Sequence, residues 1–302
     1  MIDDERVPPG WSSNPSTWRE RLPIVGLALV GFAIAAYLAA FQLGLIASVW
    51  EPFFGDGSRR ILTSGVSRFL PVPDAVLGAC GYLADAVTGM IGGESRWRTR
   101  PWLVIIFGLA VGPLGAVSVL LVILQPLVFN AYCTLCLASA AVSILMIGPA
   151  MDEVLASLQA PAANGRCRSL CVGRVLGYRG DWSGAMRRAL TMPVLVASAA
   201  LGAWVYAAPQ IGGLQGQARV IHLVAGPLIL ALSVIALWPV VRGVARVNVP
   251  IGLLLVFTPV LTATTLAWLE AAVGVVIALV ALIPPSEAHR FGGGWLSLVH
   301  RR

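Results

Sequence analysis

The sequence contains few charged residues and no lysine. Charged residues occupy 12% of its 302 positions, whereas a soluble domain carries about 25%. Hydrophobic residues make up 58% and the mean hydropathy is +0.83, which excludes a soluble enzyme and a disordered chain. All 21 basic residues are arginine and the net charge is +7. Because most of the chain has the composition of lipid-embedded helices, we expect bilayer lipid, and no nucleic acid, as its partner.

Cysteine and histidine are also scarce. Five cysteines are too few for a secreted scaffold held together by disulfides. A structural zinc site needs four ligands, and His222, His289 and His300 all lie far along the chain from the close pair Cys133 and Cys136. No metal site is therefore predicted.

Long charge-free runs indicate membrane-spanning helices, because a helix needs about 20 apolar residues to cross a bilayer. The run at 101–151 is long enough for two helices, with a break at Gln125–Asn130. A weaker span at about 75–92 carries one charge, Asp85. The other predicted spans are 22–50, 189–218, 220–241, 247–269 and 271–286, with the break between the last two near Thr262–Thr265. We predict an all-α, polytopic membrane protein with about eight transmembrane helices.

The arginines predict the orientation of these spans. With eight spans, 17 of the 21 arginines lie on one side, and only Arg59, Arg60, Arg68 and Arg219 lie on the other. Positive residues favour the cytoplasmic side, so both termini are expected in the cytoplasm of a bacterium, with the chain in its inner membrane. The first apolar run is too long for a cleavable signal peptide.

The same pattern predicts two membrane domains joined by an arginine-rich connector. A four-helix domain is followed, after the connector, by a second four-helix domain that brings no cysteine. The predicted segments are a cytoplasmic tail (1–21), the first domain (22–150), the cytoplasmic connector (151–189), the second domain (190–285) and a cytoplasmic tail (286–302).

The sequence Cys133-Thr134-Leu135-Cys136 is the motif that most strongly indicates a reactive site, a redox-active cysteine pair. It lies at the predicted start of the fourth span, near the outer face. Cysteines at i and i+3 share one face of a helix, and a helix N-terminus favours the reactive thiolate form. An oxidising outer compartment suits a cycling disulfide. The alternative is that both cysteines are small apolar fillers of a span.

Residues 20–150 resemble the vitamin K epoxide reductase family of membrane oxidoreductases. Three pieces carry the resemblance, in the order in which the family has them: Ile61–Ser64, Pro71–Tyr82 and Asn130–Ala140, which contains the cysteine motif. The resemblance implies a four-helix bundle around a quinone, either menaquinone or ubiquinone, covered by the loop between the first two spans.

The resemblance also implies roles for individual residues. Cys136 would face the quinone and pass electrons to it, and Cys133 would exchange disulfides with an extracytoplasmic, thioredoxin-like thiol protein. Ser64 would lie near the quinone, Asp74 would contact a quinone oxygen, and Tyr82 would line the second span. The implied function is a membrane thiol–disulfide oxidoreductase that reduces a quinone.

One departure from the family concerns its second cysteine pair, which lies in the loop between the first two spans. Residues 48–73 contain no cysteine here; Trp50–Glu51 and Ser58 stand about where that pair would fall. Either a partner thiol attacks Cys133 directly, or the protein is a non-catalytic scaffold or quinone-binding protein derived from the same fold.

The remaining candidates are single residues. We expect Cys80 to be a buried filler, and Cys167 and Cys171 to be separate thiols of the connector. Asp85 is either a functional intramembrane carboxylate or a group that reaches the interface. Glu270 is expected at the outer interface.

The second half resembles the SPW-repeat membrane domain over about 220–285. The pieces that carry this resemblance are Trp238–Pro239, Asn248–Gly252 and Phe257–Pro259, although the signature Ser-Pro-Trp is Thr-Pro-Val here. A transporter is disfavoured, because no broken, ion-lined pair of helices is visible.

Overall fold

The structure is a computed structural model whose described part is helical. It describes residues 7–8, 11, 13–67, 71–166, 182–262, 267–283, 295 and 298. All secondary-structure elements assigned within these ranges are helices, which confirms the all-α prediction. The chain divides into two compact units, a first unit of Met1–Cys167 with His289–Arg302 and a second unit of Arg168–Ala288.

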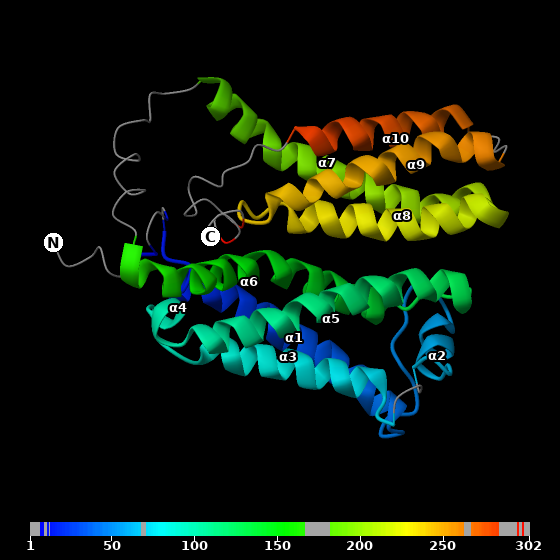
Figure 1. Cartoon of the computed structure of the whole chain (residues 1–302). Coiled ribbons are helices and arrows are strands. Elements are labelled where there is room, and N and C mark those ends of the chain that lie inside the picture. Colours follow the sequence, from blue (N-terminus) through cyan, green and yellow to red (C-terminus); the bar gives the residue numbers. More distant parts are fainter. Residues whose placement is uncertain are drawn as a thin grey trace. The chain divides into compact units, whose positions relative to one another are not determined.

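The first unit is a bundle of four long helices with a short helix at each end. Figure 1 shows α2 at the end where α5 stops and α6 begins, and α4 at the opposite end. The long helices are α1 (Trp18–Gln42), α3 (Asp74–Met90), α5 (Pro101–Val128) and α6 (Thr134–Arg166), and the short ones are α2 (Gly57–Leu62) and α4 (Arg96–Thr99).

Small residues bring α1 and α3 together at the centre of this bundle. Ala28 and Ala35 of α1 are buried in the same apolar cluster as Tyr82 of α3. A Cβ atom at Gly31 would collide with the Tyr82 ring. Small residues allow such close approach in membrane bundles, where packing replaces the hydrophobic effect.

Buried arginines close the α4 end of the first unit. Arg21 donates to the carbonyl oxygens of Gly92 (2.8 Å) and Ile91 (3.0 Å), where α3 ends. Arg96 donates to the Ile91 carbonyl (3.1 Å) and forms a buried ion pair with Glu153 of α6. Carbonyl groups at a helix C-terminus lack intrahelical partners, so these arginines satisfy them while anchoring α1, α4 and α6 to one another.

The second unit packs its helices through glycine contacts. A Cβ at Gly202 of α7 would lie 2.9 Å from the Gly226 carbonyl oxygen of α8, and one at Gly252 of α9 would lie 2.7 Å from the Gly274 carbonyl oxygen of α10. Its elements are α7 (Trp182–Gly212), α8 (Gly216–Ile235), the 3₁₀ helix η2 (Arg242–Val247), α9 (Asn248–Thr262) and α10 (Ala267–Leu282).

Each of the eight predicted spans corresponds to a helix, but the count of eight crossings stays a prediction. Within the described residues, six segments are long and apolar enough to cross a membrane, which supports a multi-pass membrane protein. The helices α3, with 17 residues, and α10, with 16, are shorter. Residues 263–266, where the break near Thr262–Thr265 was expected, lie outside the described residues.

The predicted break at Gln125–Asn130 is misplaced by a few residues. Helix α5 continues through Gln125 and Pro126 to Val128, and the turn follows it. Asn130 takes a positive φ of 46° in this turn, a conformation that asparagine tolerates better than most residues. The proline lies in the last turn of α5, so it interrupts the helix less than a central proline would.

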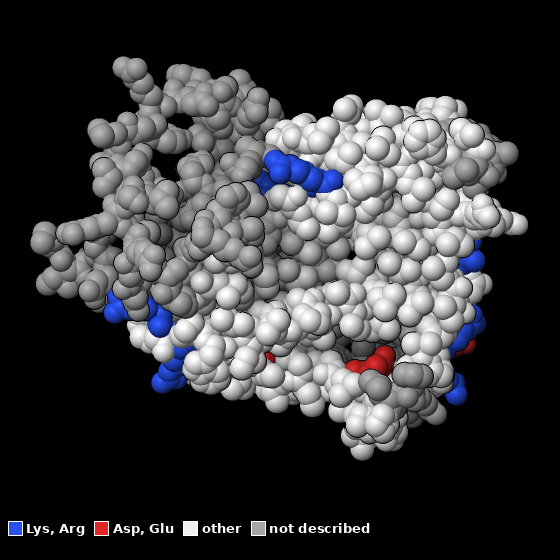
Figure 2. Space-filling model, in the orientation of Figure 1, with Lys and Arg blue, Asp and Glu red and all other residues white. Residues whose placement is uncertain are grey.

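Charge is concentrated at the two ends of the first unit. Figure 2 shows basic side chains at both ends and a mostly uncharged surface between them. Exposed arginines include Arg59 and Arg60 of α2 at one end, and Arg98 and Arg100 at the other. The uncharged band matches a lipid-facing surface, since ionisable groups are costly in the hydrocarbon core.

Candidate functional site

The two cysteines of the motif form a disulfide at the start of α6. The Cα atoms of Cys133 and Cys136 are 5.2 Å apart. Cys133 directly precedes the helix, and its sulfur accepts a hydrogen bond from the Cys136 N–H (3.1 Å). The motif therefore lies where the sequence predicts it, at a helix N-terminus with its partial positive charge.

Gln125 at the end of α5 holds the motif in place. Its backbone carbonyl accepts hydrogen bonds from the N–H groups of Phe129 (3.2 Å) and Ala131 (3.3 Å), which closes the turn. Its side-chain oxygen accepts the Cys133 N–H (2.9 Å). The residue read from sequence as part of a break is thus the connection between α5 and the disulfide.

Cys133 and Cys136 face different surroundings. Cys133 is fully buried, with 0% of its surface exposed. Cys136 lines a cavity of about 260 Å³ that lies between the four long helices. The walls are mostly aliphatic, from residues such as Leu38, Leu114 and Leu121. Cys136 is therefore the cysteine of the disulfide that lies beside the space for a small apolar ligand inside the bundle.

A polar cluster lies at the rim of this cavity, where α1 and α3 meet. Asp74 Oδ1 accepts hydrogen bonds from the Gln42 amide (2.7 Å) and the Ser67 hydroxyl (2.8 Å). It also accepts the N–H of Ala75 (2.9 Å) in the first turn of α3. Asp74 lines the cavity, so hydrogen-bonding groups stand beside its apolar walls, the usual composition of a small-molecule site.

A second polar cluster surrounds Tyr82 deeper in the bundle. Tyr82 lines the cavity and is only 1% exposed. Its hydroxyl donates to the Ser139 carbonyl (2.7 Å) and lies 2.6 Å from the Ser143 hydroxyl, both on α6. Ser118 of α5 donates to Ser143 (3.1 Å). Tyr82 thus ties α3 to α6 below the disulfide.

Ser64 is not among the residues that line the cavity. Its hydroxyl accepts the N–H of Ser67 at 3.3 Å, so it contacts the Asp74 cluster through Ser67. Gln42, Ser67 and Gln125 belong to the site but were not identified from the sequence. Gln42 and Gln125 are amide side chains within charge-free runs, which was the available signal for these two.

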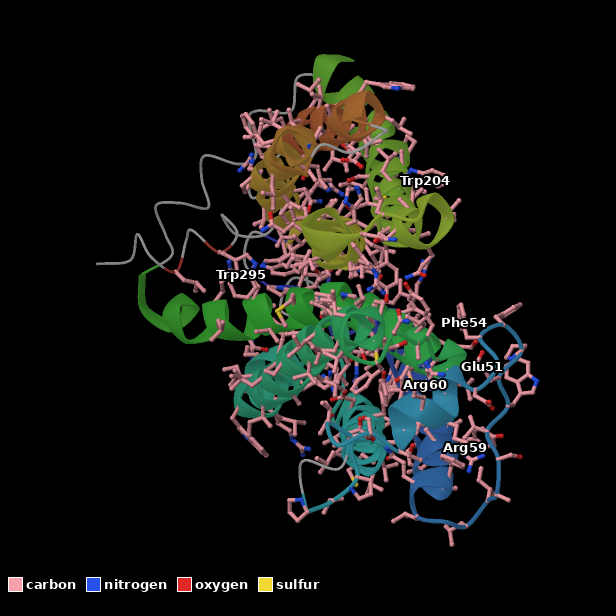
Figure 3. All side chains as sticks on the ribbon, turned by 90° about the vertical axis from the view of Figure 1, so that its right-hand side faces the viewer. Glu51, Phe54, Arg59, Arg60, Trp204 and Trp295 are labelled. Carbon is pink, nitrogen blue, oxygen red and sulfur yellow. A yellow bond between two sulfur atoms is a disulfide. The ribbon has the colours of Figure 1, made fainter. Side chains whose placement is uncertain are left out.

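The loop between α1 and α3, described over residues 43–67 and 71–73, reaches the disulfide end of the bundle. Figure 3 shows Glu51, Phe54, Arg59 and Arg60, all from this loop and its helix α2, gathered at that end. Glu51 accepts the N–H of Thr134 (2.9 Å), between the two cysteines. The loop therefore touches the motif without supplying a cysteine.

The structure shows the surroundings of Cys80 and Asp85, two residues of α3 that the sequence singled out. Cys80 was expected to be buried, and this is wrong: it is a free thiol on the exposed face of α3. A small apolar side chain is compatible with a surface turned toward lipid. Asp85 is 1% exposed, so its carboxyl lies inside the bundle rather than at an interface. Cys167 and Cys171 lie outside the described residues.

The second unit contains a separate, largely apolar cavity of about 180 Å³. His222 of α8 and Glu270 of α10 line it, with Nε2 and Oε1 4.0 Å apart. Trp204 is on the same wall. Glu270 is 8% exposed and lies in the first turn of α10; its expected position at the outer interface stays a prediction. Among the residues described, no three His, Cys, Asp or Glu side chains are grouped to hold a metal ion.

Comparison with known proteins gives a family match within the first unit. No curated protein and no solved structure matches the chain, and the resemblance of the second half to the SPW-repeat domain stays a prediction. The identified family consists of membrane redox enzymes and is linked generally to quinones. Residues 22–150, which hold the disulfide and its cavity, match the model of the Vitamin K epoxide reductase family.

Proposed function

We propose that the first unit is a thiol–disulfide oxidoreductase that passes electrons from a thiol partner, through Cys133 and Cys136, to a quinone. One observation carries the proposal: the Cys133–Cys136 disulfide forms part of the wall of a cavity within the bundle. The family match supports redox chemistry over these residues.

The residues of the cavity fit a quinone ring. Aliphatic walls suit its apolar face, and the Asp74 cluster provides polar groups at one side. A quinone bound there takes up two electrons and two protons. Cys136, on the cavity wall, is the sulfur placed to deliver them, and Gln125 holds the Cys133 N–H so that the motif keeps its position.

In the proposed reaction, two thiols of the donor reduce the Cys133–Cys136 disulfide. A thiolate attacks Cys133 Sγ, forming a mixed disulfide and breaking the bond to Cys136 Sγ. A second thiol of the donor then displaces Cys133, leaving the donor oxidised and both cysteines as thiols. Reforming the Cys133–Cys136 bond releases two electrons and two protons, which reduce the quinone. The thiol donor is proposed to be a thioredoxin-like protein outside the cytoplasm.

The test uses the full chain in proteoliposomes with menaquinone or ubiquinone and dithiothreitol as the thiol donor. Quinone reduction, followed by its ultraviolet absorbance, is expected for the natural sequence and lost in the Cys133→Ser, Cys136→Ser double variant. Cys80→Ser is the matched control, because Cys80 is exposed on α3 and should leave the rate unchanged. Activity that survives in the double variant would contradict the proposal and favour a non-catalytic scaffold.

A further inference from the structure

Glu51 has an unusual number of hydrogen bonds for a loop carboxylate. Its oxygens accept the N–H of Thr134 (2.9 Å) and the hydroxyl groups of Thr134 and Ser58. They also accept the backbone N–H groups of Phe53 (3.2 Å) and Phe54 (3.3 Å). One side chain therefore joins its own loop, helix α2 and the first residue of α6.

The segment that Glu51 attaches covers Cys133. Ile61 of α2 packs in the same buried cluster as Cys133. Gly57 lies so close to the backbone of Tyr132 that a Cβ would collide with the Tyr132 carbonyl oxygen. The rings of Phe54 and Tyr132 are 5.2 Å apart. These contacts leave Cys133 fully buried.

Burial of Cys133 conflicts with its proposed chemistry unless the loop moves. A thiolate must reach Cys133 Sγ to form the mixed disulfide and release Cys136, and a protein thiol cannot reach a sulfur that has no exposed surface. Glu51 and Ser58, which stand about where the family has its second cysteine pair, are joined here by a hydrogen bond. A hydrogen bond opens without any redox reaction, so the loop can separate from α6 while the disulfide stays intact.

We propose that Glu51 is a positioning residue that latches the α1–α3 loop onto the start of α6 and thereby controls the access of protein thiols to Cys133. This inference rests on the proposed function for its physiological meaning. The latch itself is a property of the oxidised protein and requires no quinone.

The test measures how fast the Cys133–Cys136 disulfide is reduced in the full chain. The oxidised protein is mixed with reduced thioredoxin, a large reductant, or with tris(2-carboxyethyl)phosphine, a small one. Samples are quenched in acid and alkylated, and the peptide containing both cysteines is quantified by mass spectrometry. Glu51→Ala is expected to raise the thioredoxin rate about tenfold or more, since several hydrogen bonds are lost. The phosphine rate should rise less.

Two further variants separate a latch from general loosening of the fold. Glu51→Gln keeps an acceptor oxygen of the same shape and should give an intermediate thioredoxin rate. Asp56→Asn removes a carboxylate from the same loop, and Asp56 makes no side-chain bond to the helix it precedes, so it should leave the rate unchanged. Equal effects of Glu51→Ala and Asp56→Asn would overturn the proposal, as would an equal rise with both reductants.

If Glu51→Ala does not fold, Thr134→Val replaces it as the test. This change removes the hydroxyl that donates to Glu51 and keeps a branched side chain of similar size. It should raise the thioredoxin rate by a smaller factor, and an unchanged rate would overturn the latch. Failure of the proposed function is seen separately, as the absence of quinone reduction in proteoliposomes with the natural sequence.

Discussion

Both units of this chain join their helices through buried polar groups and small residues, but these contacts lie in different places. The first unit uses buried polar groups: arginines at its α4 end, the Tyr82 cluster at its centre and the Asp74 cluster beside its cavity. The second unit uses glycine pairs, Gly202 with Gly226 and Gly252 with Gly274, which place backbone against backbone. Buried polar groups are costly unless paired. In the second unit Ser233 of α8 pairs with Ser198 of α7 (2.9 Å) and Asn248 of α9 (3.0 Å), whereas in the first unit such groups also line the cavity beside the disulfide.

Their cavities differ in the same way. The first has a disulfide sulfur and hydrogen-bonding side chains among aliphatic walls. The second is almost wholly apolar, with His222 and Glu270 as its ionisable residues. The sequence contains no cysteine after Cys171, so the helices α7 to α10 of the second unit contain no thiol. The comparison indicates that the first unit carries the proposed electron transfer, which single substitutions in each unit can test.

The largest difference is expected between the quinone-reduction rates of the Cys136→Ser and His222→Gln variants. Cys136→Ser should reduce thiol-dependent quinone reduction to the level of protein-free liposomes, because the disulfide cannot reform. His222→Gln, in the other cavity, should leave the rate within about twofold, since ordinary substitutions change little beyond their own contacts. Both rates are measured in the same proteoliposome assay. A loss in His222→Gln would show that the units act together.

Stability should depend on the Arg96–Glu153 pair in the first unit. Removing one partner of a buried ion pair leaves an uncompensated charge and costs about 3–5 kcal/mol. Glu153→Gln should therefore lower the free energy of unfolding, measured by chemical denaturation in detergent. Arg100→Gln removes an exposed charge at the end of helix α4 and serves as the control. Equal stability of the two variants would contradict the role given to the ion pair.

A smaller effect is expected from a glycine of the second unit. A Cβ at Gly252 would lie 2.7 Å from the Gly274 carbonyl oxygen and 2.9 Å from the Ala278 nitrogen. Gly252→Ala should cost about 1–3 kcal/mol, as overpacked sites do, and leave quinone reduction by the first unit unchanged. At Gly243 no atom lies within 4 Å of the added methyl, so Gly243→Ala should be neutral in the same denaturation experiment.

The smallest expected effect is the pH dependence of the Glu51 latch. Burial alone would raise the pKa of Glu51, but hydrogen bonds from Ser58, Thr134 and Phe53 outweigh it and lower the pKa from 4.5 to about 2. The ionised carboxylate therefore stabilises the closed loop fully above pH 4.5, and this contribution is lost as the pH falls through about 2.

The measurement for this prediction is reduction of the disulfide by the phosphine at pH 2 to 7, relative to an unstructured disulfide peptide. The relative rate should be constant down to about pH 4 and rise below it in the natural sequence. Glu51→Gln should show no such rise. A rise centred near pH 4.5 would mean that the hydrogen bonds do not favour the ionised carboxylate.

Some features of the site were accessible from sequence because they depend on local spacing. Cysteines three residues apart at a helix start can close a disulfide without help from other elements, and the structure has this disulfide. The resemblance over 20–150 also rests on consecutive residues, and it is confirmed for 22–150. By contrast, Gln42 and Ser67 join the Asp74 cluster from separate elements, so no local pattern identifies them.

Residue orientation was the least predictable property. Cys80 and Tyr82 are two positions apart on α3, yet the first is exposed and the second is buried against α6. An apolar helix in a membrane has apolar residues on both faces, so its sequence does not mark the buried one. The burial of Glu270 beside His222 was not predicted for a related reason: it depends on how α8 and α10 pack.

The amino-acid sequence by itself determined that this is a helical membrane protein, where its apolar helices lie, and which cysteine pair can form a disulfide. Each follows from composition or from spacing within one segment. The tertiary structure alone decided that Cys136 faces a cavity, that Cys133 is buried beneath the α1–α3 loop, and that Glu51 binds Thr134 across 83 positions of the chain. Contacts over such a distance depend on the packing of whole helices, which no local pattern records.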